Sequence, residues 1–160
     1  MIADLEELVA SAVTEIFSTM LGMNMRPVPL ESGFANGETH IAGAVGFVGR
    51  LSGVVYVFTT VSFARRITAT LLGLEEAEIK EDEMINDAMG EMANMLVGHI
   101  KSRITDRGMP CVLTIPSVVR GSNFSVEATT STEGHIFSFN TGQDRIFVQF
   151  LLKPSDASQN

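Results

Sequence analysis

Cysteine, tryptophan and tyrosine are nearly absent from this chain, with one, none and one respectively among its 160 residues. The single Cys111 excludes a disulfide within the chain. No apolar run approaches the roughly 20 residues that a membrane-spanning helix needs, and the acidic opening "MIADLEELVA" differs from the basic start of a signal peptide. These absences predict a cytoplasmic domain that is not held together by disulfides.

Basic residues are also scarce, with 11 Lys and Arg against 19 Asp and Glu, for a formal net charge of −8. A surface of this charge repels nucleic-acid phosphates and anionic membranes, so neither is expected as a partner. The three histidines, His40, His99 and His135, lack the paired spacing of zinc ligands, and no metal site is predicted.

Hydrophobic periodicity predicts three helices, at 2–22, 62–73 and about 84–104, with Ser62 as an N-cap and Gly22 and Gly73 as ends. The acidic stretch 75–83 is expected to be a solvated connector. Alternating and β-branched segments predict strands in 23–33, in a hairpin over 39–60, and in 111–121, 124–134, 135–141 and 144–153.

This order of elements predicts one α+β domain over residues 1–153, with helices packed on an antiparallel β-sheet. Residues 154–160, "PSDASQN", are expected to form a disordered tail.

The third predicted helix has two contrasting faces. One is apolar and is expected to face the core; it comprises Ile85, Met89, Met92, Leu96 and Ile100. Asp87, Glu91, Asn94 and Gly98 fall within roughly 60° of one another on the opposite side. Asn and Gly both lower helix stability, and Gly98 leaves the backbone bare for close approach by a partner. A solvated polar face is the alternative interpretation.

The first predicted helix repeats this spacing with Ser11, Glu15, Ser18 and Gly22. Both helices fit the pattern [DS]-x3-E-x2-[NS]-x3-G, and proline-bearing β segments follow each of them. The repeat indicates a diverged internal duplication with two pseudo-equivalent helices.

The segment "DAMGEMANMLVGHIKSRI", followed by "LTIPSVVRG", resembles the CheC/CheX family of chemotaxis phosphatases. The family signature places Asp or Ser, then Glu, then Asn on one helix, with a proline further along the chain. Those positions are Asp87, Glu91, Asn94 and Pro116 here. The resemblance runs from about residue 5 to 153 and includes "FSTMLGMNMRP" near the start. Ser18 replaces the Asn of an active motif in the first helix, which implies a single working site, as in CheX.

The resemblance implies hydrolysis of the aspartyl phosphate on a CheY-like response regulator. An acyl phosphate is already reactive, so catalysis consists mainly of placing a water in line with phosphorus and organising charge around it. Asn94 suits this task because a neutral amide both donates to and accepts from a water. Glu91 is expected to pair with the regulator's active-site lysine, and Asp87 to make a flanking contact.

Further expectations concern partners. The chain itself is expected to need no cofactor, because Mg²⁺ would be held by the regulator's acidic pocket. By resemblance the chain is expected to form a homodimer through a sheet edge, supplied by 144–150 or 124–130. The alternative functions are a non-catalytic module that binds a response regulator through the same helix and a structural dimerisation domain.

Overall fold

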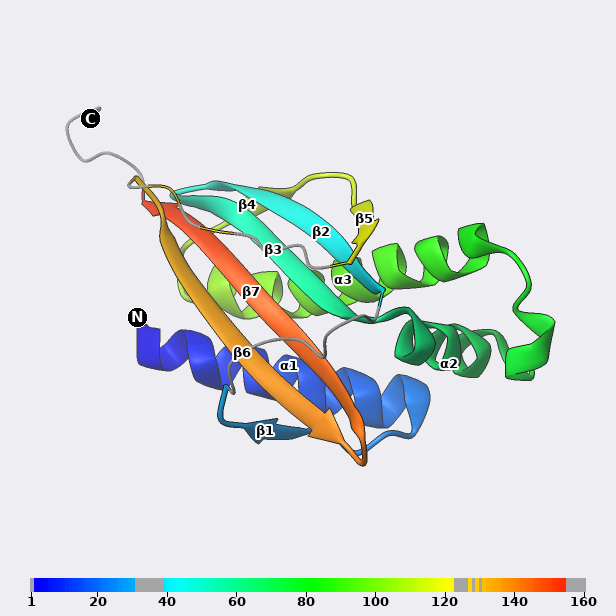
Figure 1. The fold of residues 1–160 in the computed structure, drawn as a ribbon. Helices are drawn as coiled ribbons and strands as arrows, with labels where there is room; N and C mark the ends of the chain where they lie inside the picture. The colour runs from blue at the N-terminus through cyan, green and yellow to red at the C-terminus, as the bar shows by residue number, and fades with distance from the viewer. Residues whose placement is uncertain (1, 31–38, 123–126, 128, 130, 155–160) are drawn as a thin grey trace.

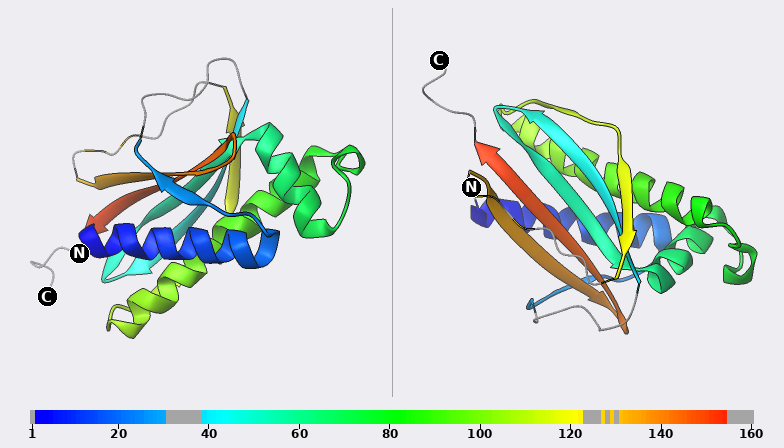
Figure 2. Two further views of the ribbon diagram at one scale, coloured as in Figure 1. Left: turned by 90° about the horizontal axis from the view of Figure 1, so that it is seen from below. Right: turned by 45° about the horizontal axis from the view of Figure 1, so that its top comes forward.

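The computed structural model describes residues 2–30, 39–122, 127, 129 and 131–154. One antiparallel sheet of seven strands carries three α-helices on one face (Figures 1 and 2). The predicted α+β class with an antiparallel sheet is confirmed. The helices are α1 (Ile2–Leu21), α2 (Val61–Leu72) and α3 (Asp82–Asp106), with a short 3₁₀ helix η1 (Glu76–Glu78) between α2 and α3.

The strands are β1 (Arg26–Val28), β2 (His40–Gly49), β3 (Leu51–Thr60), β4 (Cys111–Leu113), β5 (Ser117–Gly121), β6 (Glu133–Thr141) and β7 (Asp144–Pro154). The predicted single strand at 111–121 is therefore wrong, because the segment is divided into two strands. The predicted strand at 124–134 is wrong where the structure describes it, because residues 131–132 form a turn and residues 133–134 already belong to β6. Residues 124–126, 128 and 130 lie outside the described residues, as does the predicted tail beyond Pro154.

The N-cap of α2 differs from the prediction. Thr60, not Ser62, caps the helix: its backbone is extended, and its hydroxyl accepts a hydrogen bond from the Phe63 N–H at 3.1 Å. Ser62 already lies inside the first turn, so it cannot serve as a cap. Gly73 ends this helix as predicted, in the left-handed conformation with φ 67°, and Gly22 follows α1 with φ 65°.

The sheet order supports the interpretation of an internal duplication. Along the sheet the strands run β1-β6-β7-β3-β2-β4, with β5 also paired to β2. If β1, β2 and β3 are exchanged with β4/β5, β6 and β7, the order is reproduced in reverse. The central β3–β7 pair then lies on the pseudo-two-fold axis, and α1 and α3 take equivalent places on the helical face.

This order also corrects the expectation about a dimer edge at 144–150. Strand β7 pairs with β3 on one side and with β6 on the other, so it presents no free backbone edge. The outer strands of the described sheet are β1 on one side and β4 with β5 on the other.

The core lies between the sheet and the helices, and α3 packs closely against the sheet at Gly43 of β2. A Cβ built at Gly43 would lie 2.6 Å from the Met89 carbonyl oxygen and 2.9 Å from the Ala93 Cβ. Only glycine permits this contact between helix and strand. This contact fixes the distance between α3 and the sheet, and hence the position of the outer face of α3.

Candidate functional site

The outer face of α3 carries the polar set that the sequence places there. Asp87 and Glu91 are exposed, while Asn94 and Gly98 are half-buried. The opposite face is fully buried, with exposed fractions of 0–2% for Ile85, Met89, Met92, Leu96 and Ile100. The predicted division of this helix into a core face and a polar face is therefore confirmed.

Charged residues at both ends of α3 complement the helix dipole. Asp82 and Glu83 lie in the first turn and Arg103 in the last, each where its charge complements the helix dipole. In the middle of the helix, the side chains of Asp87, Glu91 and Asn94 make no hydrogen bond or ion pair with another described residue. The carboxylate of Glu91 and the amide of Asn94 are one turn apart and are free to contact a partner.

Pro116 lies beside this face through a glycine of the same helix. A Cβ built at Gly90 would meet the Pro116 Cβ at 3.8 Å and the Val118 Cγ2 at 3.9 Å. Gly90 precedes Asn94 by one helical turn, so Pro116 flanks the Asn94 side of the polar set. The structure thus brings Pro116 next to the helix that carries Asp87, Glu91, Asn94 and Gly98.

Arg120 of β5 ties the start of α3 to the sheet. Its Nε donates to the Asn86 Oδ1 at 2.8 Å, and its Nη2 donates to the Asp82 carbonyl oxygen at 3.0 Å. Its Nη1 also lies 3.6 Å from the Asp82 carboxylate. These contacts hold the helix turn that immediately precedes Asp87.

The α1 helix presents the corresponding residues differently. Glu15 is exposed, but its Oε2 lies 3.4 Å from the His99 Nε2 and 3.9 Å from the Arg103 Nη2, both on α3. The contact to His99 lacks hydrogen-bond geometry. Glu15 is therefore directed toward two basic side chains of its own chain.

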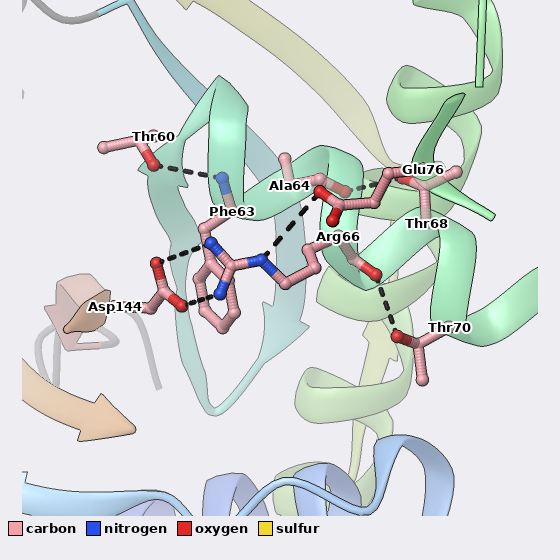
Figure 3. Close-up of polar contacts among 8 residues, drawn as sticks. All are labelled: Thr60, Phe63, Ala64, Arg66, Thr68, Thr70, Glu76 and Asp144. Carbon is pink, nitrogen blue, oxygen red and sulfur yellow. Dashed lines mark hydrogen bonds and ion pairs between the residues drawn. The ribbon is translucent and has the colours of Figure 1, made fainter. Parts of the chain in front are cut away.

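A second polar network surrounds Arg66 of α2 (Figure 3). Its guanidinium makes a bidentate contact with Asp144, approaches Glu76 at 3.9 Å and lies 5.6 Å from the centre of the Phe63 ring. A cavity of about 330 Å³ adjoins this network. The contact with Asp144 joins α2 to the β6–β7 turn. Because the guanidinium is already paired, we interpret the network as stabilising the fold and not as binding a ligand.

A cavity of about 540 Å³ lies between α1, β1 and β6, and its lining contains no residue of the α3 polar set. That set projects from a convex helix surface, which suits insertion into a partner better than enclosure of a small molecule. Among the described residues, no group of three or more His, Cys, Asp or Glu side chains is arranged to hold a metal ion. Within the same residues, no helix has the length and apolar character needed to span a membrane.

Sequence reasoning missed Arg120, and it also missed Thr114, whose backbone N–H and hydroxyl both hydrogen-bond to Gly46 of β2 at 2.8 Å. Both lie in the segment read as one strand, 111–121. Pro116 was the sequence signal for a break in this predicted strand, since proline inside a strand marks an edge or a bulge.

Together, the antiparallel sheet and the polar outer face of α3, with Glu91 exposed and Asn94 half-buried, define an α+β protein with a polar helix face directed outward. Comparison with known proteins identifies the family. The family described as chemotaxis phosphatase CheX matches residues 41–140, a range that includes α3 and Pro116. The chain belongs to the CheX family.

Among curated proteins, the CheY-P phosphatase CheX of Thermotoga maritima is 26% identical over 85 residues, which is 52% of this chain and 54% of that protein. The match thus spans about half the length of that relative. A crystal structure of the chemotaxis protein CheX from Desulfovibrio desulfuricans has a TM-score of 0.76 at 24% identity and covers 94% of this chain and 99% of that chain. A CheX–CheY–BeF₃–Mg²⁺ complex from Borrelia burgdorferi has a TM-score of 0.73 at 19% identity, covering 92% and 96%.

Proposed function

We propose that this chain dephosphorylates a CheY-like response regulator, with Asn94 positioning the water that attacks the aspartyl phosphate in line. The observation that carries the proposal is the position of Glu91 and Asn94 on the outer face of α3 in a CheX-family fold, with neither side chain paired to another residue in the described part of the chain. The α3 helix inserts into the regulator's phosphorylation pocket. Asn94 accepts from and donates to the water there, which lowers the entropic cost of the attack.

The remaining residues of the face orient the complex. Glu91 pairs with the regulator's active-site lysine, and Asp87 makes a flanking contact one turn earlier. Gly98 has no atom within 4 Å of a built Cβ, so the helix backbone is open to close approach there. Pro116 fixes the edge of the face against Gly90.

Magnesium is expected in the regulator and not in this chain; the related complex from Borrelia burgdorferi contains CheY, BeF₃ and Mg²⁺. The proposed reaction places the chain in the cytoplasm, where receiver domains act. A homodimer remains an expectation from the family resemblance.

The test is the decay of a phosphorylated CheY-type regulator from the same genome, with and without this protein. Wild type should accelerate decay, and Asn94→Ala should lose about 100-fold of that acceleration, as misplacement of a reacting group commonly does. Glu91→Gln should mainly raise the regulator concentration needed for half-maximal rate. Glu83→Gln, which removes another exposed carboxylate of α3, is the matched control and should behave as wild type.

The alternative is a docking module without catalysis. Stoichiometric binding of the regulator that survives Asn94→Ala, with no acceleration of phosphate loss by wild type, would favour that function. A pure docking face has no need of the amide, so retention of Asn94 beside Glu91 supports the phosphatase.

A further inference from the structure

Ile115, between β4 and β5, is the most exposed of the large apolar side chains noted in the described residues. Its exposed fraction is 89%, compared with 70% for Val112 and 47% for Val119 on the adjoining strands. A side chain of this kind gains from removal from water when a partner covers it. Its position in the fold indicates which partner that is.

Ile115 lies in a bulge of the edge strand. Phe47 pairs with Leu113 and Ala44 pairs with Ser117, so three residues, 114–116, face only two residues of β2. The extra residue interrupts the alternation of side chains across the sheet and redirects one of them.

The bulge is held firmly by Thr114. The Thr114 N–H donates to the Gly46 carbonyl oxygen at 2.8 Å, and the Gly46 N–H donates to the Thr114 hydroxyl at 2.8 Å. Ile115 therefore projects from a backbone that is fixed on both sides, by Thr114 on β2 and by Pro116 beside Gly90. A contact made from such a preorganised position costs little ordering entropy on binding.

We propose that Ile115 contacts an apolar side chain of the phosphorylated receiver domain at the rim of its phosphorylation pocket and thereby determines affinity for the regulator. This inference rests on the proposed phosphatase function. Pro116, the next residue, adjoins Gly90 of α3, one helical turn before Asn94. A receiver domain that takes Asn94 into its pocket would therefore also cover the neighbouring segment 114–116, which includes Ile115. The polar contacts of Glu91 and Asn94 are exposed to competing water, and an apolar contact beside them excludes it.

The experiment measures affinity and turnover separately. Binding to a regulator activated with BeF₃ and Mg²⁺ gives the Kd, and decay of the phosphorylated regulator gives kcat. Ile115→Ser should weaken binding about tenfold, equivalent to about 1.4 kcal/mol, with kcat at saturation unchanged. Thr114→Val, which keeps the shape but removes the hydroxyl that accepts from Gly46, should weaken binding by a smaller factor because it loosens the bulge.

Val112→Ser is the matched control: it removes an exposed apolar side chain from the same edge, opposite Val48 in the register of β2 and β4. Its Kd for the activated regulator should lie within about twofold of the wild-type value, which corresponds to less than about 0.5 kcal/mol. Equal Kd values for wild type and Ile115→Ser would overturn the inference, as would equal losses for Ile115→Ser and Val112→Ser. Conversion of an oligomer to a monomer by Ile115→Ser, seen in the solution mass, would also overturn it and assign the side chain to contact between copies of this chain. If wild type fails to accelerate phosphate loss, the proposed function itself fails, whatever Ile115 does.

Discussion

Helices α1 and α3 occupy equivalent places in the two halves of the sheet and carry the same spacing of polar residues. Glu15 corresponds to Glu91, an offset of 91 − 15 = 76 residues. Glu91 has no ion-pair partner among the described residues, whereas Glu15 faces His99 and Arg103. The same carboxylate is therefore available to a partner on one helix and engaged within the chain on the other.

The strands beside the two helices also differ: β5 contacts α3 closely, whereas a cavity lies between α1 and β1. With the same offset, Glu6, Glu7 and Ala10 of α1 correspond to Asp82, Glu83 and Asn86 of α3. Beside α3, Arg120 contacts Asp82 and Asn86, and Pro116 and Val118 adjoin Gly90. Beside α1, the corresponding residues line the 540 Å³ cavity next to the three-residue strand β1. A duplicated helix alone does not make a site, because the adjoining strand must also hold it rigidly.

The strongest test of this comparison exchanges the distinguishing residue between the two helices. Asn94→Ser copies the α1 residue into α3 and should reduce dephosphorylation of the regulator about 100-fold, since a hydroxyl does not reach or hold the water as the amide does. Ser18→Asn in that background should restore nothing, because Glu15 remains paired with His99 and Arg103. The measurement is the decay of phosphorylated regulator by each variant.

Both variants change exposed or half-buried polar residues, so their unfolding curves should match that of wild type. Rescue of Asn94→Ser by Ser18→Asn would show that the α1 face is competent and would remove the distinction drawn between the two helices.

The second test concerns how deeply α3 is seated on the sheet. Gly43→Ala places a methyl group 2.6 Å from the Met89 carbonyl oxygen, so α3 must move outward. The expected loss is about 1–3 kcal/mol in the free energy of unfolding, the usual range for overpacking. Because α3 carries Glu91 and Asn94, activity should fall as well, even in the fraction that remains folded.

Gly98→Ala is the control for this substitution. Its methyl group meets no atom within 4 Å, and alanine favours the helix by about 1 kcal/mol over glycine, so stability should rise. Urea unfolding gives the free energy of unfolding of both variants. Equal changes for Gly43→Ala and Gly98→Ala would mean that Gly43 does not set the position of α3.

Sequence reasoning predicts best what depends on neighbours along the chain. The 3.6-residue period that assigns Met92 and Leu96 to the core and Glu91 to the surface is local, and the structure confirms it. The contacts that separate the two helices are not local: Arg120 reaches Asn86 across 34 residues, and Glu15 meets His99 from another helix. The strand break at Pro116 depends on the register with β2, which periodicity does not reveal.

The last test compares the polar contacts that hold each of the two helices. Arg120→Ala removes two hydrogen bonds from a largely buried guanidinium and should lower the free energy of unfolding by about 1.5–3 kcal/mol, the range for bonds that involve a charged group. Glu15→Gln removes an exposed ion pair and should cost less than about 1 kcal/mol. Salt separates the two further, because at about 1 M ionic strength the Debye length is only about 3 Å and the Glu15 effect should disappear while that of Arg120 persists. Equal losses of unfolding free energy at high salt would mean that the contacts of Arg120 hold α3 no more firmly than the contacts of Glu15 hold α1. The rigidity of the adjoining strand would then no longer explain why α3, and not α1, carries the proposed site.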